Sequence, residues 1–301
     1  MIGGIILFGE PRKNKKGNKK VMIALLAVIT VMGIGYTFFD LGNILFKSAS
    51  GEIVEQEVED EIIREEPTLQ IMDPSSDTRP VAVIIDNVKS ALPQAGIQDA
   101  YIVYEIVVEG GQTRLLAMFK DQETEVIGPV RSARHYYLDY VLEHDAIFAH
   151  IGYSPQAKQD LRTLGVANLE GPEGDNGVFW RDRTLYAPHN AFTNIARINT
   201  NAGNRNYRAT TEVKPAFEYS IEELELQAAA LEESGESETI VKNADLVRVH
   251  YSTSHFSSYQ YDPINKVYRR FMNGLEHVDK ITGRQYTAKN IIVYNVRNFA
   301  H

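Results

Sequence analysis

Apolar segments with strand character begin near position 79 and recur up to position 121. The segment 79–87, RPVAVIIDN, is short, rich in Val and Ile, and bounded by a proline and a polar pair, so it predicts a buried strand. The segments 101–111 and 113–121 predict two further strands. A glycine pair lies between them, which is typical of a hairpin turn.

Helical patterns follow these strands. Residues 131–144 contain no proline or glycine and carry apolar side chains at helical spacing, which predicts a helix that starts at Arg131. A shorter helix is predicted over 154–165, because Ser154 is a favourable cap, a proline follows it and a glycine closes the segment. Asn190 is the predicted cap of another helix, which ends at Gly203.

Short alternating segments, LVRVHYS, SSYQYD, KVYRRF and NIIVYNV, dominate the last part of the chain. They predict strands separated by turns. We therefore expect an α+β or mixed α/β fold, in which an amino-terminal α/β domain over 78–205 is followed by a β-rich carboxy-terminal domain over 206–301. Because the sequence stops directly after a strand, we expect this second module to be incomplete or truncated.

The first 39 residues differ sharply from the rest. Residues 1–20 carry six Lys/Arg and one acid, and the next nineteen, 21–39, carry no charge. A helix of this length is roughly 28 Å long, close to the hydrocarbon thickness of a membrane. The pattern predicts a single-pass transmembrane anchor with a cytoplasmic basic segment and the bulk of the chain extracellular. A cleaved signal peptide is the alternative, because small residues at 47–51 could serve as a cleavage site.

Acidic residues dominate the chain beyond the predicted anchor. Residues 40–77 include eight acids between positions 51 and 67, which is typical of a solvated spacer. Beyond position 20 the chain has 25 basic and 39 acidic residues, a net charge of -14. This charge argues against nucleic acid as a partner. The sequence has no cysteine, which excludes disulfides, thiolate chemistry and a lipid-modified cysteine.

Arg131 and Arg134 are the first candidates for a functional site. Placed one helical turn apart at a predicted helix start, their guanidinium groups would suit a carboxylate or a phosphate. The competing interpretation is structural: both arginines could form ion pairs with Glu105 and Glu109 of the neighbouring strand.

Glu105 and Glu109 suggest a second kind of chemistry. Both side chains would lie on one face of the predicted strand, and glycan hydrolysis by an acid pair requires carboxyl groups roughly 5 to 9.5 Å apart, so a paired-carboxylate hydrolase is one interpretation. His150 and His189 could bind a metal with Asp86, but the spacing matches no known metal motif, and we predict neither a metal nor another cofactor.

The segment 179–190, FWRDRTLYAPHN, combines the only tryptophan with arginines, a histidine and an asparagine. Aromatic faces beside arginines and an amide are typical of sugar or peptide recognition on a loop. The structural alternative is an arginine stacked on Trp180, which would fix a long loop in place.

Several motifs together resemble the YerB-like family of bacterial envelope proteins. They are RPVAVIIDN, the segment 91–105, VEGGQTRLLAMF, IGPVRSAR, the segment 150–157 and YAPHN, with a weaker match at TGRQYTAKNIIV. The resemblance implies a domain of unknown function on the outer face of a Gram-positive cell membrane, and it supplies no established reaction. Members of the lipoprotein type carry a cysteine after the signal, which this chain lacks.

The sequence therefore predicts a membrane-anchored, extracytoplasmic protein that binds an anionic or glycan-like envelope polymer or a protein partner. The alternatives are a cell-wall glycan hydrolase that uses paired carboxylates and a structural or assembly protein with an internal salt-bridge network. The predicted ligand-binding residues are Asp86, Arg114, Arg131, Arg134, His150, His189 and Asn190, and the weaker catalytic candidates are Glu105 and Glu109.

Overall fold

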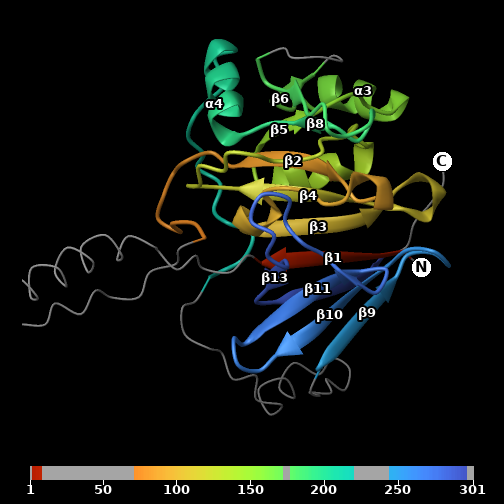
Figure 1. The fold of residues 1–301 in the computed structure, drawn as a ribbon. Coiled ribbons are helices and arrows are strands. Elements are labelled where there is room, and N and C mark those ends of the chain that lie inside the picture. Colours follow the sequence, from red (N-terminus) through yellow and green to blue (C-terminus); the bar gives the residue numbers. More distant parts are fainter. Residues whose placement is uncertain (1, 9–70, 172–176, 220–243, 297–301) are drawn as a thin grey trace, which may run out of the picture. The chain divides into compact units, whose positions relative to one another are not determined.

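The computed structural model describes residues 2–8, 71–171, 177–219 and 244–296, for which Figure 1 gives the arrangement of helices and strands. No helix in these ranges is long and apolar enough to cross a membrane. The predicted anchor at residues 21–39 lies outside the described ranges.

A mixed sheet of seven strands forms the centre of the fold. In spatial order its strands are β14 (Ile291–Val296), β1 (Ile2–Phe8), β3 (Ile102–Val107), β4 (Thr113–Phe119), β2 (Val81–Asp86), β5 (Ile147–His150) and β6 (Asn168–Glu170). The pairs β2–β5 and β5–β6 are parallel, and the other neighbours are antiparallel.

A second sheet, entirely antiparallel, comes from the carboxy-terminal part of the chain. It contains β9 (Leu246–His250), β10 (Phe256–Asp262), β11 (Val267–Met272), β12 (Leu275–Glu276) and β13 (Thr287–Ala288). A two-stranded sheet is formed by β7 (Trp180–Arg181) and β8 (Ala191–Phe192). The mixed fold class expected from the sequence is confirmed.

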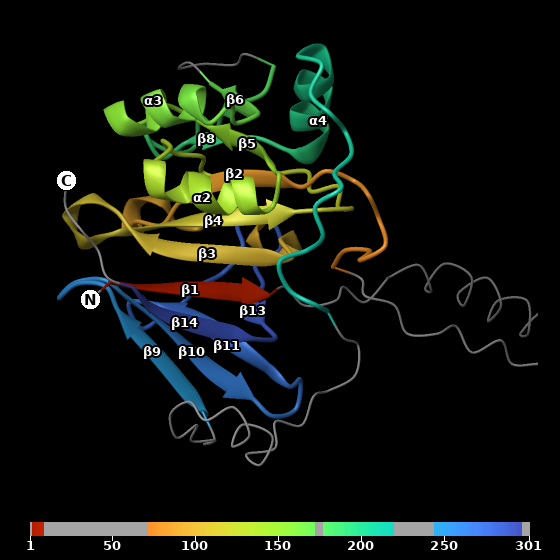
Figure 2. The same ribbon diagram turned by 180° about the vertical axis from the view of Figure 1, so that it is seen from behind.

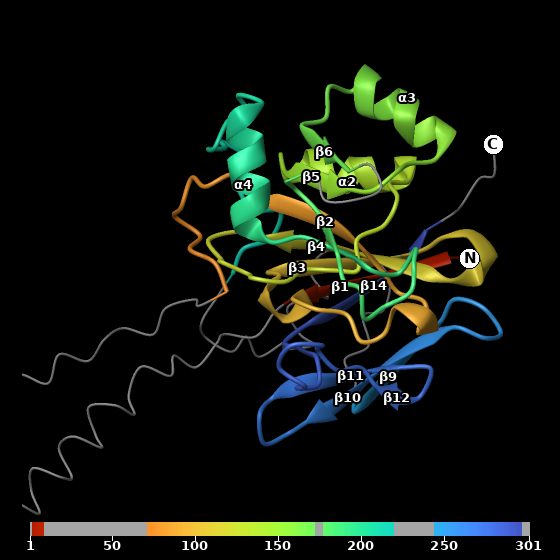
Figure 3. The same cartoon turned by 45° about the horizontal axis from the view of Figure 1, so that its top comes forward.

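Three α-helices and four short 3-10 turns complete the described elements. The helices are α2 (Leu138–Glu143), α3 (Pro155–Thr163) and α4 (Ile195–Asn204), and the turns are η2 (Lys89–Ala91), η3 (Ile97–Asp99), η4 (Glu109–Gly111) and η5 (His135–Tyr137). Figure 2 shows α2 across one face of the large sheet, and in Figure 3 strands β5 and β6 lie between α3 and α4.

Alternation along the central strands gives the large sheet two buried faces. Side chains such as Val83 and Leu115 pack with Tyr259 and Tyr286 of the carboxy-terminal part and with α4. The alternate residues, such as Leu116, pack with α2 and α3. This explains why the segment 79–87 reads as a continuous apolar run: all six residues of β2 are buried. A polar side chain near the end of a strand therefore lies either on the face that packs with the carboxy-terminal part and α4 or on the face that packs with α2 and α3.

The predicted helix at 131–144 is much shorter in the structure, because α2 begins at Leu138. The backbone N–H of Arg131 donates to Ile84, its carbonyl accepts from Ile151, and the N–H of Ala133 donates to Gly152. These sheet-like contacts hold the segment extended and leave its backbone groups unavailable for helical bonds. The prediction that Arg131 and Arg134 lie together on a helix start is wrong.

The helix predicted from Asn190 also begins later. Asn194 caps α4, since its side chain accepts a hydrogen bond from the backbone N–H of Arg197. Residues 191 and 192 are extended and pair with β7 instead. The short helix α3 agrees with its prediction, with Ser154 accepting from the N–H of Ala157 and proline in the first turn.

The buried core begins before the predicted start of the amino-terminal domain, and the large sheet takes in strands from outside the range 78–205. Ile71 and Met72, assigned to the solvated spacer, are buried in the core, so the folded part begins before position 78. Strand β14 lies in the large sheet rather than with the other carboxy-terminal strands. Strand β1 lies within the basic segment 1–20, where the hydrophobic pattern led to no strand prediction.

Candidate functional site

Asp86, Arg131 and His189 converge at the carboxyl end of β2. The Asp86 side chain is 2% exposed, and its Oδ2 lies 3.0 Å from Nε of Arg131 and 2.6 Å from Nδ1 of His189. Both basic side chains are about one quarter exposed, at 25% and 22%. One buried carboxylate thus orients two partly exposed basic groups that come from distant parts of the sequence.

Arg114 lies beside this group on the neighbouring strand. Asp86 and Arg114 are opposite each other in the β2–β4 register, so their side chains leave the sheet on the same face. One guanidinium nitrogen of Arg114 donates to the backbone carbonyl of Ser132. Burial lowers the pKa of Arg114, and the positive charges of Arg134 and Arg131 lower it further. Arg114, Arg131 and Arg134, the three arginines predicted to bind a ligand, therefore lie close enough for their charges to interact. We call Asp86, Arg114, Arg131 and His189 the Asp86 site.

Arg134 borders the Asp86 site and is held by Glu109. Nε and Nη2 of Arg134 donate to the two carboxylate oxygens of Glu109 at 2.5 and 2.9 Å. The hydrogen bond from Arg134 is the main reason that the pKa of Glu109 lies below its usual value. Arg134 thus forms an ion pair with Glu109, as the structural alternative in the sequence analysis predicted. Arg131 pairs with Asp86 instead of the predicted glutamates.

The charges around the Asp86 site do not balance. Arg114, Arg131 and Arg134 contribute three positive charges, while Asp86 and Glu109 contribute two negative ones, which leaves one positive charge before His189 is counted. The site is therefore cationic in a chain whose overall charge is -9. Such a local excess favours an anionic ligand.

Asn190 was predicted to bind the ligand directly, but its side chain instead holds the loop that carries His189. Its buried amide accepts a hydrogen bond from Arg181 at 2.9 Å and donates to the carbonyl of Leu185 at 3.3 Å. These contacts fix the ends of the loop that carries His189. Asn190 is thus a positioning residue for the loop.

His150 lies in a different environment. Its ring is fully buried, with Nδ1 2.9 Å from the carbonyl of Gly152 and Nε2 3.0 Å from the amide of Asn168. Burial lowers its pKa to about 4, so the ring stays neutral near neutral pH. These contacts place His150 in the packing around β5 and β6, and none of its contacts with the described residues joins it to the Asp86 site.

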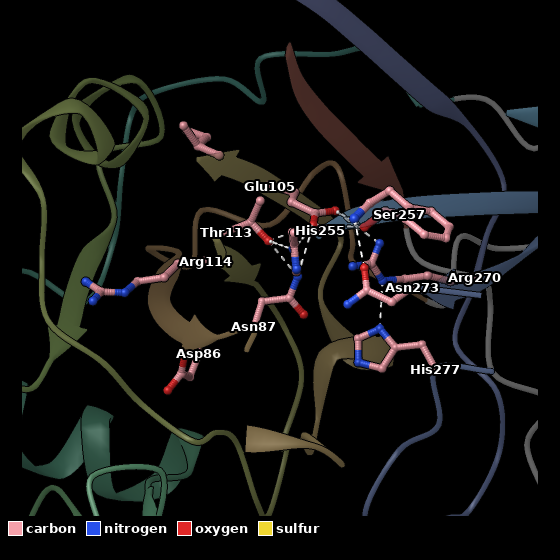
Figure 4. Close-up of polar contacts among 12 residues, drawn as sticks. Asp86, Asn87, Glu105, Thr113, Arg114, His255, Ser257, Arg270, Asn273 and His277 are labelled. Atoms are coloured by element: carbon pink, nitrogen blue, oxygen red, sulfur yellow. Dashed lines mark hydrogen bonds and ion pairs between the residues drawn. The ribbon is translucent and has the colours of Figure 1, made fainter. Parts of the chain in front are cut away.

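Glu105 belongs to a second polar cluster, on the sheet face that packs against the carboxy-terminal strands. Its Oε2 lies 3.1 Å from Nη1 of Arg270, and Ser257 donates to both carboxylate oxygens at 2.9 and 3.1 Å. Thr113 and Asn87 donate to the other oxygen at 2.8 and 2.9 Å. In Figure 4 these contacts converge on Glu105, whereas Asp86 and Arg114 lie to one side and take no part in them.

Arg270 extends this cluster to the carboxy-terminal turn region. Its Nε donates to Nδ1 of His277 at 2.8 Å, and Nε2 of His277 lies 2.5 Å from Oε1 of Gln94. Arg270 and Glu105 are 1% and 0% exposed. Burial raises the pKa of Glu105, but the charge of Arg270 and the hydrogen bond from Thr113 outweigh it, so the pKa ends below its usual value. Glu105 is therefore an anion locked in an internal ion pair.

The structure does not bring Glu105 and Glu109 together as an acid pair. Strand β3 ends at Val107, so the alternation that was expected to align the two residues stops before Glu109. Glu105 is enclosed by Arg270, and Glu109 is 65% exposed in a turn. The distance argument for glycan hydrolysis therefore loses its geometric basis.

The ring of Trp180 packs against other side chains of the protein and helps to hold its loop in place. The guanidinium of Arg197 lies 5.0 Å from the centre of its ring, and the ring of Phe192 stacks on it at 6.3 Å. The stacking that the sequence suggested is present, but the arginine comes from α4 rather than from the loop itself.

Sequence reasoning missed Arg270, Ser257, His277 and Gln94. One signal was available: KVYRRF alternates, so one of its adjacent arginines must point inward. Arg270 is that residue, while Arg269 is half-exposed and pairs with Asp262. Its partner could not be found by spacing, since 165 positions separate it from Glu105.

The two parts of this chain match the two domains of one protein family of unknown function. Residues 68–208 match the amino-terminal domain and residues 247–301 the carboxy-terminal domain of the family described as "Protein of unknown function (DUF3048)". The chain belongs to this family, which confirms the resemblance found in the sequence.

Among its relatives is "Putative lipoprotein YerB" of Bacillus subtilis, which is 34% identical over 221 residues, covering 72% of this chain and 62% of that protein. The crystal structure of the YerB protein from Bacillus subtilis matches with a TM-score of 0.56 and 30% identity, covering 70% of this chain and 66% of the other. In both comparisons the match spans less than two thirds of the relative's length.

Proposed function

We propose that this chain is an extracytoplasmic protein held at the bacterial membrane, and that it binds an anionic ligand at the Asp86 site. The location is supported by the relative named as a lipoprotein and by the apolar segment 21–39 after a lysine-rich flank. Because the chain has no cysteine, we propose that this segment replaces a lipid as the anchor.

The excess of guanidinium over carboxylate groups carries the ligand proposal. Arg131 and His189 both lie beside Oδ2 of the buried Asp86 carboxylate and still expose about a quarter of their side-chain surface, at 25% and 22%. A guanidinium that is already oriented loses little conformational freedom when it binds a carboxylate or a phosphate. Arg114 adds a further positive charge beside them.

Anions of the cell envelope are the ligands that fit this location, since the proposed site would face the wall side of the membrane. The acidic spacer and the net charge of the remaining chain do not attract such polymers, so binding would depend on the local cationic site. We therefore expect affinity to fall as ionic strength rises.

The test measures binding of anions to the full-length chain in phosphatidylcholine nanodiscs by calorimetry. The probes are inorganic phosphate, citrate and oligomers of glycerol phosphate. Arg131→Ala should weaken binding of the oligomer by about tenfold or more, because a charge-assisted contact is lost. Arg183→Ala is the matched control, since Arg183 is exposed on the loop that carries His189 and is not part of the Asp86 site. Equal binding by wild type and Arg131→Ala would refute the site.

A further inference from the structure

Tyr186 is the most exposed of the large hydrophobic side chains that the structure describes, at 91%. It lies in the loop between β7 and β8, residues 182–190, three positions before His189. Ala187 and Pro188, which lie between them, are also exposed. Three exposed residues, one of them aromatic, therefore directly precede the histidine of the Asp86 site along the chain.

This loop is fixed by its own hydrogen bonds. The N–H of His189 donates to the carbonyl of Tyr186 at 3.0 Å, which closes the turn between them. The N–H of Asp182 donates to Asn190 at 2.8 Å, and the Asp182 side chain accepts from Thr184 at 2.6 Å. Asp182 is also 3.3 Å from Nζ of Lys280. The exposed ring is thus presented by an ordered turn, at low entropic cost for binding.

The other aromatic side chain of this region is already in use. The ring of Trp180 packs with the guanidinium of Arg197 and stacks with Phe192. Tyr186 has no comparable ring contact among those described for this part of the chain. A fully exposed tyrosine on an ordered turn offers a flat apolar face together with a polar hydroxyl.

We propose that the ligand of the Asp86 site is an anionic sugar, whose charged group binds Arg131 and whose ring packs on Tyr186. This inference rests on the proposed anion-binding function and narrows its ligand class. Sugar rings present an apolar C–H face beside their hydroxyl groups, and an aromatic ring next to a cationic group recognises both features at once. A sugar phosphate or a sugar carboxylate satisfies this chemistry.

The experiment uses the full-length chain in phosphatidylcholine nanodiscs and compares three probes: glucose 1-phosphate, inorganic phosphate and glucose. Affinities are measured by calorimetry, and saturation-transfer NMR reports contacts to the sugar protons. We expect the sugar phosphate to bind about tenfold more tightly than phosphate. Tyr186→Ala should remove this difference and leave phosphate binding unchanged, whereas Tyr186→Phe should keep it. Tyr294→Ala, at a half-exposed tyrosine of β14, is the control.

The outcomes separate this inference from the proposed function. Equal affinity for sugar phosphate and phosphate in the wild type would overturn the sugar subsite and leave the anion site standing. Loss of both affinities in Tyr186→Ala would also overturn it, because the tyrosine would then act through the loop. No binding of any anion would refute the proposed function itself. Binding of only a protein partner through Tyr186 would replace the sugar inference.

Discussion

Glu105 and Glu109 are close in sequence, yet their carboxylates have different physical roles. Glu105 is 0% exposed and pairs with Arg270, while Glu109 is 65% exposed and pairs with Arg134. A buried ion pair costs desolvation and becomes strongly destabilising when one partner is removed. An exposed pair is screened by water and contributes little. These two glutamates therefore form a matched experimental pair.

We expect Glu105→Gln to lower the free energy of unfolding by about 3 kcal/mol near neutral pH, because Arg270 would be left buried without a counter-charge. Glu109→Gln should change it by less than about 1 kcal/mol. Urea unfolding of both variants, followed by circular dichroism, gives the comparison. A small effect of Glu105→Gln would mean that Arg270 finds another partner.

The same variant has a defined pH dependence. The folded pKa of Glu105 lies below the usual 4.5, because Arg270 and Thr113 outweigh the effect of burial. The stabilising contribution of Glu105 is therefore present above about pH 4.5 and is lost as pH falls through the lower folded pKa. The difference between wild type and Glu105→Gln should shrink on acidification below this value. A difference that grows would contradict the assignment.

At the residue scale, all four residues of the Asp86 site were among those that the sequence singled out. Asp86, Arg131 and His189 stand at the ends of recognisable segments, where functional groups gather, and the structure brings them together. His150 has the same residue type and a similar setting in the sequence, but burial decides its role. The contact between Glu105 and Arg270 depends on how two distant sheets pack, which no local pattern encodes.

At the scale of elements, the sequence pattern predicted the structure correctly where the backbone hydrogen bonds join residues that are close in sequence. Helix α3 has its cap, its proline and its closing glycine within one segment, and it forms where the pattern places it. The segment 131–134 has a helical pattern, but its backbone groups form hydrogen bonds with β2 and with the residues after β5. Tertiary contacts override the local preference there.

Strand β1 joins β14 to the rest of the large sheet. Ile5 lies opposite Val293 of β14 and Glu105 of β3, so it has a neighbour on both sides. In lipid-free protein, Ile5→Pro should disrupt the ladder, because proline donates no hydrogen bond. We expect faster amide exchange in 102–107 and 291–296, measured by mass spectrometry. Ile5→Val is the control, and unchanged protection in Ile5→Pro would show that β1 is dispensable.

At the scale of the whole molecule, the central issue is where the amino terminus lies. The lysine-rich flank and the segment 21–39 predict that residues 1–20 are cytoplasmic. Pairing of β1 with β3 requires these residues to be on the same side as the folded part. A single chain cannot satisfy both arrangements.

The absence of cysteine makes this question directly testable with single-cysteine variants. We expect Ser254→Cys, in an exposed turn, to react with a membrane-impermeant maleimide on intact cells. Asn14→Cys should react only after the membrane is permeabilised, because its segment precedes the predicted anchor. Reaction of both positions on intact cells would place the amino terminus with the folded part and remove the anchor from the proposed function.

The register of β1 also has a consequence for the order of events during synthesis. Leu7 pairs with Ile291, so almost the entire chain must be made before the two strands can meet. At about 5 to 20 residues per second, this takes on the order of 15 to 60 seconds. The proposed anchor at 21–39 would meet the membrane long before then, whereas in a chain refolded from denaturant all segments compete at once. The same sequence should therefore complete its large sheet with β1 after refolding, and leave β1 out when a ribosome delivers it to a membrane.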